Sequence, residues 1–228
     1  MNLFYSETRD NDAIYITGQE AVHCNKVLRK KEGAEVQVID GKGGEYTALI
    51  KSVTRDRVEA IIQSTIIHES DPKMPHLAFG MIKHPARFDW LIEKVTEVGV
   101  SRITPLICKR SEKRKIKKER AEKIILSAAK QSKTYHLPIL DEPMTTDEFL
   151  QEFPGSGLIA SWGPEAQELR HVILDDPHPR MMIGPEGDFT DQELSTFVNA
   201  GYLRVNLGRK RLRAETACVV ACALLMNK

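Results

Sequence analysis

The sequence lacks features that define several common classes of protein. Its four cysteines, Cys24, Cys108, Cys218 and Cys222, show neither Cys-x-x-Cys spacing nor a Cys/His ligand pattern, so neither a disulfide framework nor a zinc site is indicated. No apolar run reaches the roughly 18 residues of a membrane span, and the start of the chain has no signal-peptide pattern. We therefore expect a cytoplasmic protein without a metal or a membrane partner.

The phosphate-loop pattern Gly-x-x-x-x-Gly-Lys-Ser/Thr is also absent, which argues against a nucleoside triphosphatase. The formal net charge is only +1, but residues 83–133 have a net charge of +9 and residues 134–228 of −6. The basic segment, residues 109–123, holds nine basic and three acidic side chains. It is typical of a protein that binds a polyanion, although a solvated helix face would explain it equally well.

Residues 1–70 have the pattern of a small β domain. Short segments rich in Val, Ile, Tyr and Thr predict strands at 13–17, 34–40, 46–53 and 57–65, with a helical segment at 18–29 and a hairpin-type turn at 40–44. A small β-barrel is the expected fold, because closure removes exposed strand edges. The polar, twice proline-broken stretch 70–75 places a domain boundary after residue 70.

Residues 71–228 alternate between apolar strands and amphipathic helices. Strands are predicted at 76–82, 102–108, 157–162, 180–183 and 202–207, and helices at 85–98, 115–133, 165–172, 190–200 and 215–226. The last helix is apolar all round and should be buried. This alternation is typical of an α/β fold with a parallel sheet covered by helices on both faces.

Two unusual loops follow the last two predicted strands. The first is Met-Ile-Gly-Pro-Glu-Gly-Asp at 182–188, after which Thr190 and Glu193 form a predicted capping box. The second is Leu-Gly-Arg-Lys-Arg-Leu-Arg-Ala-Glu-Thr-Ala at 207–217. Loops that leave the same edge of a parallel sheet form a crevice where such sheets bind ligands.

These loops resemble the paired motifs Ile-Gly-Pro-Glu-Gly-Gly and Leu-Gly-x-Arg-Ile-Leu-Arg-x-Glu-Thr-Ala of the RsmE family. That family contains ribosomal RNA uridine-N3 methyltransferases of the SPOUT superfamily. Residues 83–100, residues 127–138 and the stretch His-x-x-x-Val-Leu-Arg at 23–29 resemble further family elements. The resemblance implies a PUA-like β-barrel at 1–70 that binds RNA, and a trefoil-knotted SPOUT methyltransferase domain at 71–228.

The resemblance also implies the activity, the cofactor and the partners. The expected reaction is methylation of N3 of a specific uridine in 16S ribosomal RNA, with S-adenosyl-L-methionine as the methyl donor. The expected partner is this RNA within the small ribosomal subunit. A homodimer is expected, with the knot and the C-terminal helix at its interface. Burial of that helix within one subunit would explain its composition as well.

The expected site residues fall into three groups. The cofactor would be held by Ile183, Gly184, Gly187, Leu207, Gly208, Leu212 and Ala217. The catalytic candidates are Arg213, Glu215 and Glu186. The candidates for RNA contact are Lys26, Arg29, Lys83, Arg87, Gln131, Lys133, Arg209, Lys210 and Arg211.

The catalytic candidates are chosen for the chemistry of uridine N3 methylation. The pKa of uracil N3–H lies far above neutrality, and a fixed guanidinium near O2 or O4, here Arg213, would favour the anion. Glu215 could orient that arginine or take the proton, but a glutamate in the first helical turn is also ordinary dipole compensation. Glu186 is a comparable candidate. No aromatic stacking platform is predicted, because Tyr135 and Trp162 are isolated in the sequence.

The chain departs from the family pattern at three places. Asp188 replaces a common glycine, Thr134 replaces an arginine, and Lys210 with Arg211 replaces an Arg-Ile pair. The sequence leaves open the target nucleotide, the proton acceptor, and whether the substrate is free RNA or an assembled subunit. A non-catalytic RNA-binding ribosome assembly factor is the alternative function, and a related methyltransferase acting on transfer RNA is a third. Binding of S-adenosylmethionine would separate the enzyme from the assembly factor.

Overall fold

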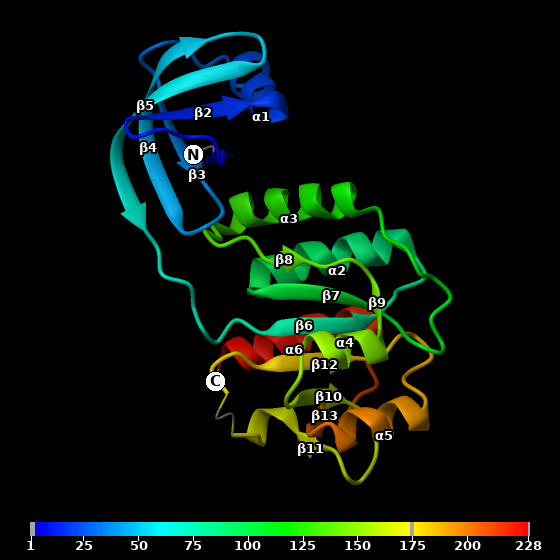
Figure 1. Cartoon of the computed structure of the whole chain (residues 1–228). Coiled ribbons are helices and arrows are strands. Elements are labelled where there is room, and N and C mark those ends of the chain that lie inside the picture. The colour runs from blue at the N-terminus through cyan, green and yellow to red at the C-terminus, as the bar shows by residue number, and fades with distance from the viewer. Residues whose placement is uncertain (1–2, 174–175, 228) are drawn as a thin grey trace. The chain divides into compact units, whose positions relative to one another are not determined.

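The chain folds into two units in a computed structural model that describes residues 3–173 and 176–227 (Figure 1). The first unit contains Met1–Ser70 and Ala129–Leu137, and the second contains Asp71–Ala128 and Pro138–Lys228. The change of unit after Ser70 coincides with the proline-broken connector. Segment 129–137 differs from the sequence-based division, which assigns it to the second domain.

A curled five-stranded sheet forms the first unit, in the order β1-β3-β4-β5-β2. Its strands are β1 (Leu3–Tyr5), β2 (Ala13–Thr17), β3 (Glu35–Ile39), β4 (Gly44–Val53) and β5 (Arg57–Ile67). Of the strand pairs described in this sheet, β1–β3 is parallel and the other three are antiparallel. Among the described strands, edge strands β1 and β2 do not pair, so the sheet is a half-barrel rather than a closed barrel. Tyr15 N donates to Thr8 O (2.9 Å), and this bond pairs β2 with the chain that leaves β1.

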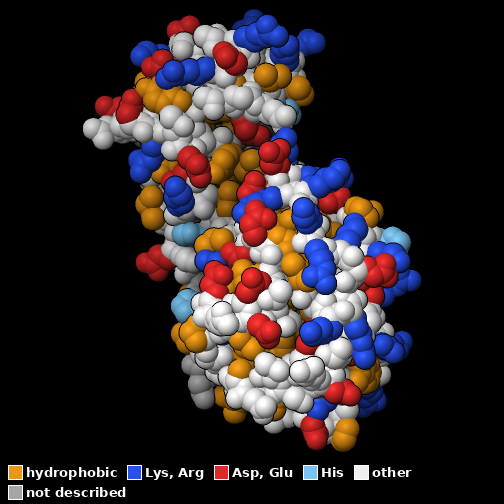
Figure 2. Space-filling view, turned by 45° about the vertical axis from the view of Figure 1, so that its right-hand side comes forward, with side chains coloured by type: hydrophobic (Ala, Val, Ile, Leu, Met, Phe, Trp, Pro, Cys, Tyr) orange, Lys and Arg blue, Asp and Glu red, His pale blue; other side chains and the backbone are white. Residues whose placement is uncertain are grey.

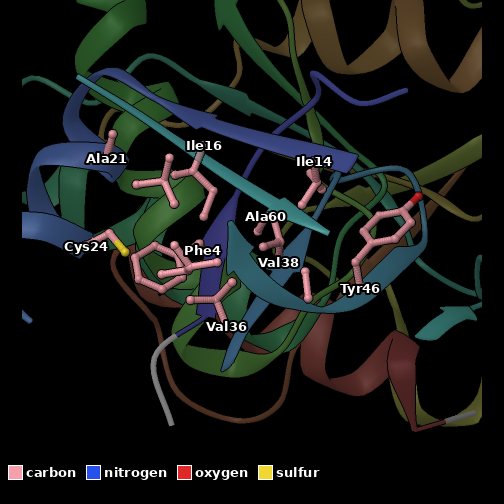
Figure 3. Close-up of a cluster of buried hydrophobic side chains, with 12 residues drawn as sticks. Phe4, Ile14, Ile16, Ala21, Cys24, Val36, Val38, Tyr46 and Ala60 are labelled. Carbon is pink, nitrogen blue, oxygen red and sulfur yellow. The ribbon is translucent and has the colours of Figure 1, made fainter. Parts of the chain in front are cut away.

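The core of the first unit lies on the inner face of this sheet (Figure 3). Alternate residues of β4 are buried because successive side chains of a strand point to opposite faces. The helical segment begins as α1 (Gly18–Val22) and continues as a π-helical turn (His23–Val27), in which Leu28 N donates to His23 O (3.0 Å). The labelled core side chains are Phe4, Ile14, Ile16, Ala21, Cys24, Val36, Val38, Tyr46 and Ala60.

The glycine-rich loop 40–44 receives segment 129–137. Gly43 N donates to Tyr135 O (3.0 Å) and Leu137 N donates to Gly41 O (2.9 Å). A Cβ atom on Gly43 would lie 2.5 Å from the backbone oxygen of His68, and the φ angle of Gly43 is +99°. The predicted hairpin-type turn is therefore also a docking surface that only glycine can form.

The second unit contains a parallel sheet in the order β11-β13-β10-β12-β6-β7-β8, with β9 also paired to β7. Its strands are β6 (His76–Gly80), β7 (Arg102–Ile107), β8 (Ile139–Leu140), β9 (Met144–Thr145), β10 (Gly157–Ala160), β11 (Gln167–Glu168), β12 (Arg180–Ile183) and β13 (Tyr202–Asn206). Strand β10 lies between β12 and β13, so three strands that carry loops of interest end side by side.

Helices cover both faces of this sheet. One face packs against α6 (Ala214–Met226), which also packs against α2 (Pro85–Val98). Helices α4 (Thr146–Glu152) and α5 (Asp191–Asn199) contribute Phe149 and Phe197 to an apolar core that contains residues of β6, β7, β10 and β12. The remaining helix is α3 (Lys118–Ser132). The mixed α/β fold with a parallel sheet confirms the expected class.

Most predicted elements are confirmed within a few residues, but one is wrong. Residues 165–172 do not form a helix: Gln167–Glu168 is strand β11, paired with β13, and Leu169–His171 is a single 3₁₀ turn. Asn206 Nδ2 donates to Ala166 O (2.9 Å) and Leu169 is buried, so contacts with β13 override the local preference. Strand β1 and helix α4 were not predicted.

Helix α6 is less uniformly buried than its composition suggests. Cys218, Ala221 and Cys222 are buried, whereas Val219, Val220 and Leu224 are partly exposed. All four cysteines are buried and free. Across residues 3–173 and 176–227, no helix is both long and apolar enough to cross a membrane. The same residues contain no group of three or more His, Cys, Asp or Glu side chains arranged to hold a metal ion.

Candidate active site

A cavity of about 410 Å³ lies at the carboxyl ends of β10, β12 and β13, and its volume is typical of a small-molecule site. The sequence-predicted crevice is therefore present at the expected edge of the sheet. Its lining residues are Arg87, Ala160, Ser161, Trp162, Ile183, Gly184, Pro185, Glu186, Asp188, Val205, Asn206, Leu207, Lys210, Arg211, Leu212, Arg213, Ala214 and Ala217.

The loop after β12 crosses directly over the end of β6. A Cβ atom on Gly80 would lie 2.3 Å from Pro185 N, so only glycine allows this approach. At Gly184, a Cβ atom would lie 2.8 Å from Asp188 Oδ1 and 3.0 Å from Phe189 N. The turn closes where Asp188 N donates to Pro185 O (2.8 Å). Gly80 was not singled out from the sequence, although it ends a buried strand.

Asp188 stands where the resembled motif has glycine, and its backbone adopts a conformation typical of glycine. Its φ angle is +63°, in the left-handed region that glycine adopts readily and aspartate tolerates better than most residues. Its Oδ1 atom accepts a hydrogen bond from Phe189 N (2.8 Å). The loop therefore keeps a conformation that suits glycine without containing one at this position.

The segment after β7 holds the first loop in place. Arg110 Nη1 donates to Gly187 O (2.7 Å) and to Phe189 O (3.2 Å), and its aliphatic stem covers Gly187. Lys109 N donates to Glu193 Oε1 (2.7 Å), while Glu193 Oε2 accepts from Thr190 N (2.8 Å) in the predicted capping box. The basic segment thus holds the loop after β12 and the start of α5 in place, a role that its charge alone did not indicate.

The structure divides the expected cofactor residues into two groups. Ile183, Gly184, Leu207, Leu212 and Ala217 line the cavity. Gly187 and Gly208 do not belong to the lining. Gly187 instead lies beside Arg110, and Gly208 has a φ angle of +120° with open space where a Cβ atom would lie. These two glycines shape the loops rather than the cavity wall.

The catalytic candidates occupy different environments. Arg213 is the N-cap residue of α6 and lines the cavity. Glu186 also lines it, is exposed, and accepts a hydrogen bond from Lys83 N at Oε1 (3.0 Å). Glu215 is only 7% exposed, and its Oε1 atom lies 3.6 Å from Arg87 Nε. Its partner is thus Arg87 rather than Arg213.

One oxygen of Glu215 has no hydrogen-bond partner among the described residues. This atom, Oε2, is buried. A buried carboxylate oxygen without a partner is unfavourable, so this position is not explained by contacts with the rest of the described protein. The paired oxygen faces Arg87, whose side chain is 37% exposed and lines the cavity.

The RNA candidates are divided between the two units. Arg87, Lys210 and Arg211 line the cavity, Lys83 Nζ pairs with Glu112 (2.8 Å), and Arg209 is exposed outside the lining. Lys26, Arg29, Gln131 and Lys133 are exposed and belong to the first unit. Lys and Arg side chains gather along one flank of the second unit in Figure 2. The structure therefore does not collect all the RNA candidates into one unit.

The fold and the cavity define an α/β protein with a ligand site at the strand ends, preceded by a small β unit. A family model described as an RNA methyltransferase domain matches residues 69–226, and another described as an RNA methyltransferase PUA domain matches residues 16–63. The chain belongs to this RNA methyltransferase family. The expected family relationship is confirmed over most of the sequence.

Individual relatives agree with the family assignment. Ribosomal RNA small subunit methyltransferase E from Synechocystis sp. is 27% identical, over 92% of this chain and 71% of the relative. The structure of the enzyme of that name from Neisseria gonorrhoeae bound to S-adenosyl methionine is 29% identical, with a TM-score of 0.89 over 100% of this chain and 97% of that one. A probable rRNA-methyltransferase from Porphyromonas gingivalis is 28% identical, with a TM-score of 0.89 over 100% and 98% of the two chains.

Proposed function

We propose that this protein transfers a methyl group from S-adenosyl-L-methionine to N3 of a uridine in small-subunit (16S) ribosomal RNA. The observation that carries the proposal is the cavity built by the two loops at the ends of β12 and β13, within an RNA methyltransferase domain. The Neisseria relative, bound to S-adenosyl methionine, supports the choice of cofactor.

The residues of the cavity suit such a cofactor. Gly80 lets the loop after β12 cross the end of β6, and Gly184 lets that loop turn back on itself. Gly184 lines the cavity without a side chain, so a flat ligand can approach the backbone there. Ile183, Leu207 and Leu212 supply apolar walls. When bound, S-adenosylmethionine supplies an electrophilic methyl group. The protein supplies orientation and the exclusion of water.

Arg213 is the proposed group that stabilises the uridine anion. It lines the cavity at the N-terminus of α6, where the helix dipole also favours negative charge. Between the two carboxylates, Glu186 is the better proton acceptor because it lines the cavity and only its Oε1 atom carries a hydrogen bond. Glu215 is proposed to position Arg87 instead.

RNA contact is proposed for the basic residues around the cavity and for those of the first unit. Arg87, Lys210 and Arg211 would neutralise phosphates near the target, and the basic segment would extend this surface. Because such binding releases counterions, RNA affinity should fall steeply with salt. A target base must leave its stack to enter a cavity of this kind.

The assembly state and context are also proposals. The partly exposed side chains of α6 suit a homodimer interface, and the family resemblance suggests a trefoil knot and a cytoplasmic enzyme acting on the small ribosomal subunit. Sedimentation of the purified protein would test the dimer. A monomer at micromolar concentration would contradict it.

The primary test is calorimetric titration of the purified protein with S-adenosylmethionine. Ala217→Leu extends a side chain into the cavity and is a better blocking variant than any change at Gly208, where the positive φ angle would strain the loop. Saturable binding by the wild type that weakens in folded Ala217→Leu supports the site. Failure of the folded wild type to bind, with or without RNA, would favour the non-catalytic assembly factor.

The reaction itself needs a separate test. Mass spectrometry of small-subunit ribosomal RNA incubated with enzyme and cofactor should detect one N3-methyluridine. Arg213→Ala should reduce the rate by about a hundredfold or more, the range expected when a group that stabilises developing charge is removed. Glu186→Gln should lower the methylation rate by removing the proposed proton acceptor, whereas Glu215→Gln should act mainly through Arg87. Methylation at another atom or on transfer RNA alone would overturn the assignment.

A further inference from the structure

Trp162 occupies an unusual place for a large aromatic side chain. It follows β10 and lines the cavity, yet 50% of its surface is exposed. Strand β10 lies between β12 and β13, so Trp162 leaves the sheet between the two loops that bear the proposed cofactor residues. Core packing therefore does not explain this tryptophan, and an exposed indole face beside a cavity suits a flat ligand.

One guanidinium fixes the loop that carries Trp162. Arg204 on β13 donates from Nε to Ser161 Oγ (3.0 Å) and from Nη2 to Trp162 O (2.9 Å), and its Nη1 pairs with Glu165. The Arg204 side chain is 19% exposed, and a Cβ atom on Gly163 would lie 3.2 Å from its Nη2 atom. The loop is thus held before any ligand arrives, which reduces the entropy lost on binding.

We propose that the Trp162 indole stacks on the heterocyclic base of a nucleoside in the cavity, and that this base is the adenine of S-adenosylmethionine. The inference rests on the proposed function. Adenine is favoured over the uracil of the RNA because Trp162, Asn206 and Leu207 lie together at the strand ends that form the cofactor loops. A purine also offers a larger face to an indole than a pyrimidine does.

Arg204 is a positioning residue in this arrangement. It acts on the ligand through the backbone of Trp162 and the hydroxyl of Ser161, so its effect on binding depends on the presence of the indole. A structural role alone would change stability without this dependence. A double-mutant cycle between positions 162 and 204 separates the two.

The chain has two tryptophans, which makes the test direct. Trp90 lies on α2, is 42% exposed and does not line the cavity. In Trp90→Phe protein, tryptophan fluorescence comes from Trp162 alone. S-adenosylmethionine and adenosine should quench this fluorescence saturably, whereas methionine should not. A uridine-containing oligonucleotide without cofactor should leave it unchanged.

Affinity measurements complete the test. Trp162→Leu should weaken S-adenosylmethionine binding at least fivefold, in line with the effect of removing a base-stacking aromatic residue, and raise KM for the cofactor with little change in kcat. Trp162→Phe should remain within about threefold of the wild type, and Trp90→Leu should have no effect. Arg204→Met should weaken binding in the wild type but not further in Trp162→Leu.

The outcomes distinguish this inference from the proposed function. If the wild type fails to bind S-adenosylmethionine by calorimetry, the proposed function fails. If it binds but Trp162→Leu binds equally tightly, only the role of Trp162 falls. Quenching by the oligonucleotide and not by adenosine would overturn the adenine assignment and place the target base against the indole.

Discussion

At position 188 the chain places an aspartate in a backbone conformation that usually belongs to glycine. The φ angle of +63° strains most side chains, and the hydrogen bond from Phe189 N to Asp188 Oδ1 offsets part of that strain. Glycine would remove the strain and the hydrogen bond together. Alanine would lose the hydrogen bond and keep the strain.

We therefore expect Asp188→Gly to leave the free energy of unfolding within about 0.5 kcal/mol of the wild type, and Asp188→Ala to lower it by about 1–2 kcal/mol. Urea unfolding followed by tryptophan fluorescence measures this difference, because both tryptophans belong to the second unit. Equal destabilisation by both variants would show that the side-chain bond, and not the φ angle, controls this turn.

His76 is a buried histidine at the amino end of the central strand β6, whereas the cavity lies at the carboxyl ends of the strands. It is 9% exposed, its Nε2 atom lies 2.7 Å from Thr104 Oγ1, and its ring packs against Phe149 and Phe153. Burial lowers the pKa of His76 from 6.5 to about 3, and the positive charges of Arg180 and Arg102 add to the decrease. The ring is therefore neutral in the folded protein at neutral pH.

The sign of the pH dependence follows from this shift. Below about pH 6.5 the unfolded chain binds a proton at His76 that the folded chain does not, so stability is lost as the pH falls toward 3. Between pH 7 and pH 4 this group should lower the free energy of unfolding by about 3 kcal/mol. His76→Gln should show a shallower loss in urea titrations over that range. Parallel curves for the two proteins would contradict the assignment.

At the scale of elements, Arg110 connects the end of β7 to the loop after β12. Its two hydrogen bonds to Gly187 O and Phe189 O help to fix the loop from outside the cavity. Loss of this guanidinium should let the loop move, because hydrogen bonds from charged donors are stronger than neutral ones. The effect should appear in cofactor binding although Arg110 does not line the cavity.

Arg110→Gln should weaken S-adenosylmethionine binding about tenfold, since two charge-assisted bonds are lost. Arg114→Gln is the matched control: Arg114 is exposed in the same basic segment and the charge change is identical. Calorimetry should find normal cofactor binding for the control, while RNA affinity and its salt dependence fall similarly in both variants. Equal cofactor binding by both would exclude a positioning role for Arg110.

The elements also show what the sequence could and could not predict. Periodicity identified α2 and the capping box identified the start of α5, because each signal lies within the element. Two features escaped sequence-based prediction because both depend on β13, some forty residues away. These are the pairing of β11 with β13, where a helix was expected at 165–172, and the hydrogen bond from Arg204 to Trp162 O. Motifs identified most of the cavity lining, whereas Gly80 and Arg110 became recognisable only when distant loops met.

At the scale of the whole molecule, the division into two units lets the effect of a substitution on one unit be measured apart from its effect on the other. A Cβ atom on Gly43 would lie 2.5 Å from His68 O and 2.7 Å from His136 Nε2, and the φ angle of Gly43 is positive. Gly43→Ala should therefore disturb the loop that receives segment 129–137 and lower the stability of the first unit by about 2–3 kcal/mol.

Both tryptophans report on the second unit, so two probes can follow the two units. In Gly43→Ala protein, the far-ultraviolet circular dichroism transition in urea should begin earlier than in the wild type, while the fluorescence transition should change little. Gly155→Ala is a matched control, since Gly155 also has a positive φ angle but open space at its Cβ position, in the second unit. A common shift of both probes in Gly43→Ala would mean that the units unfold together.

The assignment of segment 129–137 to the first unit also has a consequence for synthesis on the ribosome. Residue 70 emerges well before residue 137, and at roughly 5–20 residues per second the intervening stretch takes about 3–13 s to translate. Throughout that interval the glycine loop has no Tyr135 or Leu137 to bind. The nascent β unit is thus completed only after residues 71–128 of the second unit have been translated, so the rate of elongation affects when the first unit can finish folding.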